Sequence, residues 1–167
     1  MTVSLFLGKE EVQMQKAQYG ILRFAKYKGP EISNIEAHNE RKKEKYASNP
    51  DIDNSRRNLN YHLIEPVGKY RAESNRLIEE YGCRTRKDSV RVVEVLITAT
   101  PEFFKGKKKS EIRAYFQTAL EFIKKYQDSE TILSAVVHMD EKTPHMHLSF
   151  APITQDGRLC AKEILGN

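Results

Sequence analysis

Two β-type runs near the end of the chain constrain its fold more than any other feature. They are Thr131–His138 (TILSAVVH) and His145–Pro152 (HMHLSFAP), separated by the six residues Met-Asp-Glu-Lys-Thr-Pro. β-branched and alternating apolar residues favour strands, and a short polar connection that contains proline favours a turn. We therefore expect an antiparallel hairpin, in which a four-residue loop over Asp140–Thr143 allows His138 to pair with His145.

The rest of the chain alternates between strand patterns and helix patterns. Alternating or continuous apolar residues predict strands over Tyr19–Tyr27, Leu59–Ile64 and Val90–Thr98, the last of them central. Apolar spacing and end signals predict three helices: a short one capped by Ser33 or Asn34 that carries Arg41, one over Tyr70–Tyr81 closed by Gly82, and one over Ser110–Tyr126 with Ser110 as N-cap. This order is compatible with α/β or α+β, and the hairpin favours an α+β fold with a central antiparallel β-sheet flanked by helices.

Length, charge and cysteine content narrow the class of protein less sharply. The 167 residues predict a single domain over 1–167. A net charge of +5, from 28 basic and 23 acidic residues, suits a polyanionic partner but is also common on ordinary soluble domains. No apolar run reaches the roughly 18 residues of a membrane helix, and the start of the chain lacks a signal-peptide pattern, so we expect a cytoplasmic protein. Cys83 and Cys160 fit neither a disulfide framework nor a metal knuckle, and we interpret both as incidental thiols.

Three of the five histidines, His138, His145 and His147, fall within ten positions of the predicted hairpin. Side chains at i and i+2 of a strand share a face, so His145 and His147 project together. With His138 opposite His145, all three imidazoles meet on one face, about 5 Å apart as direct cross-strand neighbours. Three neutral imidazoles on rigid strands predict a divalent-metal site with positions open to substrate oxygens or water.

The same residues also have a purely structural interpretation. His145 and His147 are then the polar face of an amphipathic strand, and the acidic residues of the turn serve solubility. Under the metal-site hypothesis, by contrast, Glu141 acts as a proton acceptor or as an outer-shell partner of the site.

Several segments together resemble one family of proteins. The block HMDEKTPHMH (His138–His147) resembles the third motif of the Mob/Pre family, the MobV-type plasmid relaxases of the HUH endonuclease class, and His38-Asn39-Glu40-Arg41 resembles its HNxR motif. Asp51–Tyr61 is similar to the middle motif, and Arg86-Lys87-Asp88 also fits the family. The resemblance runs from about Tyr19 to the end. His62 departs from it, because many members have an acidic residue there.

The resemblance implies an HUH relaxase-like fold, ferredoxin- or palm-like, and a specific reaction. Such enzymes nick one strand of plasmid DNA at an origin of transfer by transesterification, with a covalent 5′-phosphohistidine intermediate. The matching nucleophile is His38, whose ordinary pKa near 6.5 leaves it largely neutral at pH 7. Glu141 orients this histidine or takes its proton. Arg41, three residues further along the same predicted helical face, contacts the scissile phosphate.

The resemblance also implies a metal and a partner. His138, His145 and His147 hold a divalent ion, Mn²⁺ or Mg²⁺, with imidazole ligands favouring Mn²⁺, although Zn²⁺ suits the same ligands in a preparation. The partner is single-stranded or supercoiled plasmid DNA in a bacterial cytoplasm. Expected DNA-contact residues are basic, amide or aromatic: Arg56, Arg57, Asn60, Tyr61, Arg84, Arg86 and Lys87.

Three further expectations remain open from the sequence. Relatives continue beyond Leu165-Gly166-Asn167, so we expect a truncated domain that lacks a C-terminal region through which the protein forms a homodimer. A rolling-circle replication initiator is an alternative, with a tyrosine nucleophile among Tyr19, Tyr46 and Tyr61. A non-catalytic DNA-binding module is the second alternative, in which the histidines bind no metal.

Overall fold

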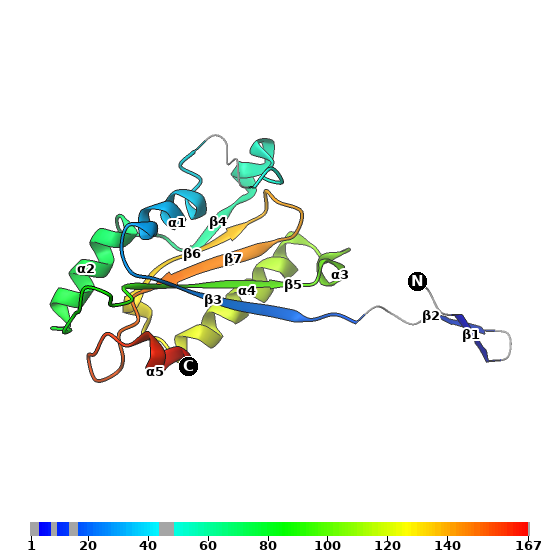
Figure 1. The fold of residues 1–167 in the computed structure, drawn as a ribbon. Coiled ribbons are helices and arrows are strands. Elements are labelled where there is room, and N and C mark those ends of the chain that lie inside the picture. The colour runs from blue at the N-terminus through cyan, green and yellow to red at the C-terminus, as the bar shows by residue number, and fades with distance from the viewer. Residues whose placement is uncertain (1–3, 8–9, 14–16, 44–48, 167) are drawn as a thin grey trace.

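A five-stranded antiparallel sheet forms the centre of the fold (Figure 1). The computed structural model describes residues 4–7, 10–13, 17–43 and 49–166. Across the sheet the strands follow the order β3 (Gly20–Tyr27), β5 (Val92–Ala99), β7 (His145–Phe150), β6 (Ile132–His138) and β4 (Tyr61–Ile64). The predicted α+β class and the antiparallel sheet are confirmed. The strand predicted over Val90–Thr98 lies inside the sheet, but β7 is the middle strand.

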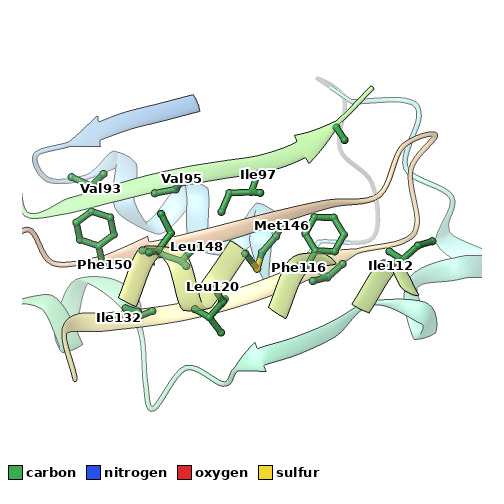
Figure 2. Packing of buried hydrophobic residues seen from close by; sticks show 14 of the residues in the cluster. Val93, Val95, Ile97, Ile112, Phe116, Leu120, Ile132, Met146, Leu148 and Phe150 are labelled. Carbon is green, nitrogen blue, oxygen red and sulfur yellow. The ribbon is translucent and has the colours of Figure 1, made fainter. Parts of the chain in front are cut away.

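Helices cover both faces of the sheet, so the molecule has three layers (Figure 1). Helix α4 (Lys109–Lys124) packs on one face, where its buried side chains Phe116 and Leu120 belong to a core with Met146, Leu148 and other strand residues (Figure 2). Helices α1 (Glu31–Asn39) and α2 (Tyr70–Glu80) pack on the other face through a second core that contains Ile32, Tyr70 and Leu77. The alternation of side chains along each strand supplies both cores.

Two predicted helix starts are wrong. Helix α1 begins at Glu31 because Pro30 already has helical backbone angles, φ −57° and ψ −33°, so Ser33 and Asn34 lie inside the helix. Helix α4 begins at Lys109, and the Glu111 carboxylate accepts the backbone N–H of Lys108 at 2.6 Å. This contact satisfies the first turn without Ser110 as a cap.

The end of α2 is as predicted. Gly82 has a left-handed φ of 65°, and the N–H groups of Gly82 and Cys83 bond back to the carbonyls of Glu79 and Ile78 at 3.0 and 2.9 Å. This pair of bonds closes the last turn of a helix and usually requires glycine at the left-handed position.

The smaller elements connect or extend these layers. They are the separate hairpin β1 (Ser4–Leu7) and β2 (Glu10–Gln13), which the sequence patterns did not predict, the 3-10 helices η1 (Asn54–Leu59) and η2 (Ser129–Thr131), and the short helices α3 (Pro101–Phe104) and α5 (Ala161–Leu165). Because η1 extends to Leu59, the strand predicted from Leu59 begins at Tyr61. Cys83 and Cys160 are free thiols, as expected. Within the described ranges, no helix has the length and apolar character needed to cross a membrane.

Candidate metal centre and active site

The β6–β7 hairpin has the predicted register. His138 pairs with His145, and His147 pairs with Val136. The connection contains the six residues 139–144 instead of the four predicted, since Met139 and Pro144 also lie outside the strands. The three imidazole ring centroids lie 4.8 to 5.2 Å from one another. The hairpin thus brings His138, His145 and His147 together on the face of the sheet toward α1.

Each of these three histidines donates one ring N–H to a protein acceptor. His138 Nε2 donates to the backbone oxygen of Asn39 at 2.7 Å, His145 Nδ1 to the backbone oxygen of Thr143 at 2.9 Å, and His147 Nδ1 to Glu94 Oε1 at 3.0 Å. Because the other nitrogen of a neutral imidazole carries a lone pair, these contacts fix which nitrogen can bind a cation. Those nitrogens are His138 Nδ1 and His147 Nε2; the third position open to a cation is His145 Nε2, which faces Glu141 Oε2 at 3.0 Å.

The remaining nitrogens of His138 and His147 fit a divalent ion. Both are buried and have no hydrogen-bond partner among the described residues. An unpartnered buried nitrogen is costly unless something else binds it. Donor atoms within 4.8 Å of one another form two groups, one of His38, His138 and His147 and one of His138, Glu141 and His145. Of the three predicted ligands, His147 therefore belongs to the first group, His145 to the second and His138 to both.

Burial keeps the two innermost imidazoles neutral. It lowers the pKa of His138 to about 4. Burial also lowers the pKa of His147, despite the opposing effect of the Glu94 carboxylate. A histidine binds a metal through its neutral form, so both rings are in the binding form near pH 7.

His38 lies beside this cluster, on the last turn of α1. Its ring centroid is 5.5 Å from that of His147 and 6.0 Å from that of His138. Burial, and then the positive charge of Arg41, lowers the pKa of His38. The residue predicted as nucleophile, one hundred positions before His138, is thus a neutral, half-buried imidazole at the edge of the cluster.

The sequence predicted that Arg41 shares a helical face with His38, and this prediction is wrong. Helix α1 ends at Asn39, and Arg41 has a left-handed φ of 50°, the only positive φ of a non-glycine residue in the described part of the chain. Arg41 N–H bonds to the carbonyl of His38 at 3.3 Å, and Lys42 N–H bonds to that of Ala37 at 2.9 Å. A turn of the same type closes α2, where Gly82 occupies the left-handed position that Arg41 occupies here.

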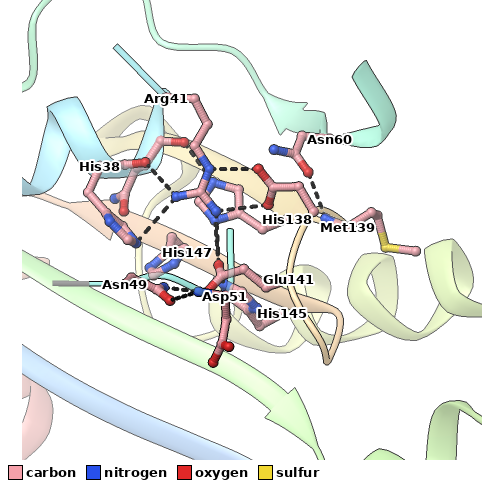
Figure 3. A network of polar contacts seen from close by, with 12 residues as sticks. His38, Arg41, Asn49, Asp51, Asn60, His138, Met139, Glu141, His145 and His147 are labelled. Atoms are coloured by element: carbon pink, nitrogen blue, oxygen red, sulfur yellow. Dashed lines mark hydrogen bonds and ion pairs between the residues drawn. The ribbon is translucent and has the colours of Figure 1, made fainter. Parts of the chain in front are cut away.

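The left-handed turn directs the Arg41 guanidinium to the hairpin connection (Figure 3). It donates to both carboxylate oxygens of Asp140 at 2.9 and 2.8 Å, to Glu141 Oε2 at 2.9 Å and to the His38 carbonyl at 3.0 Å. Glu141 Oε2 in turn lies 3.0 Å from His145 Nε2. Burial alone would raise the pKa of Glu141, but contacts with His138 and His145 hold it well below its ordinary value. Arg41 therefore joins the end of α1 to the hairpin.

One group of predicted DNA-contact residues lies next to this site. The N–H of Asp53, which precedes η1, bonds to the Asp140 carbonyl at 2.7 Å, and the Asn60 side-chain oxygen accepts the N–H of Met139 at 2.7 Å. Arg56 and Arg57 lie on η1, the first exposed and the second half-buried. Asn60 anchors the hairpin connection, and Arg56 is the exposed cation of this segment.

A second group lies at the other end of the sheet. Arg84, Arg86 and Lys87 are exposed on the connection between α2 and β5. Val93, at the start of β5, pairs with Phe150, the last residue of β7, whereas His145 is the first. At about 3.3 Å per residue, the length of β7 places these cations roughly 16 Å or more from His145.

Neither of the two alternative tyrosine nucleophiles that the structure describes is brought to the cluster. Tyr61 pairs with Val137, a residue of the α4 core, so it lies on the opposite face from His138, and its ring is 4.7 Å from the Arg113 guanidinium. Tyr19 is 64% exposed. Among the described residues neither tyrosine makes a hydrogen bond or ring contact with a histidine of the cluster. Tyr46 lies outside the described residues.

Sequence reasoning missed two residues that contact the cluster. Glu94 lies on β5, is 9% exposed and accepts from His147. Burial raises its pKa, but the contacts with His147, Asn39 and His38 together outweigh burial, and the net shift is downward. A carboxylate inside the apolar run VRVVEVLIT was the available signal, because buried charges need partners. Asn39 is 1% exposed and accepts from His138.

His62, the departure from the family pattern, forms an ion pair beside the nucleophile helix. Its Nε2 donates to Glu40 Oε2 at 2.6 Å. This hydrogen bond raises the pKa of His62 above its ordinary value, because its effect is larger than the opposing effect of burial. A histidine whose pKa is raised on folding stabilises the protein fully below its unfolded-state pKa, near 6.5, and this contribution is lost as pH rises through the folded-state pKa.

We predict that the His62→Gln variant will lose this pH dependence. Between pH 6 and pH 8.5 the parent's free energy of unfolding should fall by about 1 kcal/mol more than that of the variant, the difference between a hydrogen bond from a charged donor and one from a neutral donor. Urea unfolding at a series of pH values measures the free energy of unfolding of both proteins. Parallel pH profiles for the two proteins would contradict the prediction.

Comparison with known proteins gives one consistent family. The family model described as "Plasmid recombination enzyme" (Mob_Pre) matches residues 16–167. A plasmid recombination enzyme type 1 of Staphylococcus aureus is 40% identical over 154 residues, covering 89% of this chain and 38% of the relative. One from Lactiplantibacillus plantarum is 38% identical over 150 residues, covering 87% of this chain and 41% of the relative. The chain thus spans about two fifths of these relatives.

A solved structure shares the fold. It is the Mn-bound MobM relaxase domain in complex with plasmid pMV158 oriT DNA, with a TM-score of 0.82 and 32% sequence identity, and the match covers 88% of this chain and 76% of that chain. A second crystal structure of that domain, also bound to Mn and oriT DNA, gives a TM-score of 0.79.

Proposed function

This chain belongs to the plasmid recombination enzyme family (Mob_Pre), and on that premise we propose that it is a plasmid-mobilisation relaxase domain that nicks one DNA strand at an origin of transfer. The observation that carries the proposal is a neutral imidazole, His38, beside three convergent histidines with ring centroids within 5.2 Å of one another. Phosphoryl transfer requires a positioned nucleophile and a group that stabilises charge on the phosphoryl oxygens, and His38 beside a ligand set for a divalent ion can supply both.

We assign the ion to His138, His145 and His147, whose lone-pair nitrogens are His138 Nδ1, His145 Nε2 and His147 Nε2. A divalent ion there would neutralise charge on the phosphoryl oxygens. Three imidazoles favour Mn²⁺ over Mg²⁺, and the related domain was crystallised with Mn. Zn²⁺ is the competing ion for the same ligands.

In the proposed reaction, the lone-pair nitrogen of His38 attacks phosphorus. The phosphorus–nitrogen bond forms while the bond to the 3′ oxygen breaks, which gives a 5′-phosphohistidine and a 3′ hydroxyl. The ring loses the proton from its other nitrogen as the 3′ oxygen gains one, so charge is balanced. Because no water is consumed, the 3′ hydroxyl can attack the intermediate and rejoin the strand.

Arg41 and Glu141 support this step in different ways. Glu141 lies within 3.0 Å of both Arg41 and His145, and its lowered pKa suits it to orienting the site more than to accepting a proton. Arg41 holds the His38 carbonyl and the hairpin together. Its Nε and Nη2 pair with Asp140, whereas Nη1 lies 3.5 Å from His38 Nε2, a position suited to contact with the scissile phosphate.

The proposed DNA contacts begin at the segment next to the site. Arg56 is exposed beside the hairpin connection and is suited to a phosphate near the nick. Arg84, Arg86 and Lys87 can contact DNA only where the strand extends to the other end of the sheet. Tyr61 is less suited to base stacking, since its ring packs on Arg113.

The test is to trap the covalent intermediate. The protein is incubated with Mn²⁺ and a supercoiled plasmid that carries its origin of transfer, and denatured with detergent. We expect nicked plasmid with protein on the 5′ end, through a bond stable to alkali and labile to acid, as a phosphorus–nitrogen bond is. An acid-stable bond indicates a tyrosine nucleophile, a free 5′ phosphate indicates hydrolysis, and intact plasmid that is merely bound indicates a non-catalytic module.

A further inference from the structure

Asn39 connects the helix that carries His38 to two of the histidines of the metal centre. It is the last residue of α1 and follows His38 directly. Its backbone oxygen accepts from His138 Nε2 at 2.7 Å, and its side-chain Nδ2 donates to Glu94 Oε2 at 2.7 Å. The other oxygen of Glu94 accepts from His147 Nδ1 at 3.0 Å. One residue therefore reaches His138 directly and His147 through one carboxylate.

We propose that Asn39 is a positioning residue that sets the tautomer and orientation of His138 and His147, and so holds the metal ligands and the nucleophile in one frame. This inference rests on the proposed function, because it assigns these histidines to an ion. Asn39 contacts neither the ion nor DNA in this scheme. It acts on the reaction through the two histidines.

Burial gives these contacts their strength. Asn39 is 1% exposed, His138 0%, His147 8% and Glu94 9%. A hydrogen bond shielded from water is stronger, and a buried group that loses its partner incurs the full desolvation penalty. The chain of contacts from Asn39 to His147 is thus difficult to break or rearrange.

The chemistry of the chain requires an amide at position 39. An ionised Glu94 only accepts hydrogen bonds, so its partners at both oxygens must be donors. The asparagine amide supplies a donor without a second charge, whereas an aspartate at position 39 would place a second carboxylate directly against that of Glu94. The carbonyls of the last helical turn lack partners within the helix and carry the negative end of its dipole, which suits the Asn39 oxygen to a histidine N–H.

The position of Asn39 on α1 links these contacts to His38. His38 and Asn39 are consecutive, so a displacement of the helix end that moved the nucleophile would also move both anchors of the metal ligands. The distance between the attacking nitrogen and the ion is then set by α1 itself and not only by the hairpin.

The experiment uses Asn39→Ala with Gln127→Ala as a matched control. Gln127 is another buried amide, 3% exposed, which bonds to Thr131 and Ala151 away from the histidines. Mn²⁺ affinity is measured by calorimetry. Nitrogen-15 NMR of the metal-free proteins reports the histidine tautomers. We expect Asn39→Ala to weaken Mn²⁺ binding about 10- to 100-fold, as loss of an outer-shell partner does, and Gln127→Ala to leave it unchanged.

The NMR readout separates positioning from a general loss of stability. In the parent, His138 should carry its proton on Nε2 and His147 on Nδ1. Asn39→Ala should change the His147 tautomer population but not that of His138, because the backbone carbonyl remains. In a Glu94→Ala background the Asn39→Ala change should weaken binding no further, since both act along one path.

The outcomes distinguish this inference from the function on which it rests. A parent whose Mn²⁺ affinity does not depend on His147 would remove the proposed metal centre. A parent that needs His147, together with an Asn39→Ala variant that binds Mn²⁺ as the parent does, would overturn only the inference. If Asn39→Ala does not fold, the parent's tautomers decide: a proton on Nδ1 of His138 or on Nε2 of His147 contradicts the proposed contacts.

Discussion

The His38→Ala variant is expected to form no covalent DNA adduct, with nicking of the origin reduced by about 10⁴-fold or more, the scale on which loss of a nucleophile acts. The expectation follows from position. His38 is a neutral imidazole at the edge of the metal cluster, 5.5 Å from the ring of His147. None of the three proposed ligands is removed, so Mn²⁺ affinity should fall far less than it does when His147 is removed.

Adduct formation on denaturing gels and calorimetry with Mn²⁺ measure the two halves of this prediction. Tyr19→Phe and Tyr61→Phe are the comparison variants, because these tyrosines are the alternative nucleophiles within the described residues. The adduct should persist in both. An adduct that survives in His38→Ala and disappears in either tyrosine variant would falsify the histidine mechanism and support a tyrosine one.

The second large effect is expected at the metal centre. His147→Ala should weaken Mn²⁺ binding by more than about 100-fold, the upper range for loss of an outer-shell partner, because a ligand is removed. His147 Nε2 is buried and has no hydrogen-bond partner among the described residues, which supports the proposal that it binds the ion. The variant should also lose the stabilisation by metal, about 2.7 kcal/mol at a Mn²⁺ concentration of 100 times the parent's Kd.

His62→Ala is the matched control for this variant. It removes a histidine that pairs with Glu40, outside the metal cluster, and should retain the rise in unfolding temperature with Mn²⁺. Thermal unfolding with and without the ion compares the three proteins. Equal Mn²⁺-dependent shifts in the parent and His147→Ala would contradict the assignment of His147 as a ligand.

Local sequence patterns predicted the convergence of the three histidines because its geometry is local. The register of a short hairpin and the two-residue period of a strand suffice to bring His138, His145 and His147 together, as the structure confirms. Helix α2 was similarly predictable, since apolar spacing and Gly82 mark its extent and its end. Bringing His38 to the cluster needed the family resemblance, as one hundred residues separate it from His138.

Tertiary contacts account for what was missed. The contact between Glu94 and His147 spans 53 residues, and that between Asn39 and Glu94 spans 55. Nothing in the strand or helix periods pairs these residues. The face that Tyr61 occupies could not be predicted, because the alternation in a four-residue edge strand does not show it. The distance of Arg84 from the site depends on strand order, which no local pattern gives.

The left-handed Arg41 has a consequence for any attempt to make this domain more robust. An L-residue in that conformation costs about 1 to 2 kcal/mol relative to glycine, which closes the equivalent turn of α2. Glycine at position 41 would relax the backbone yet delete every contact of the guanidinium with Asp140, Glu141 and the His38 carbonyl. Because that change would leave the buried Asp140 carboxylate unpaired, at a cost of about 3 to 5 kcal/mol that exceeds the strain relieved, selection for heat tolerance should retain Arg41, and stabilising substitutions are better sought on the α4 face.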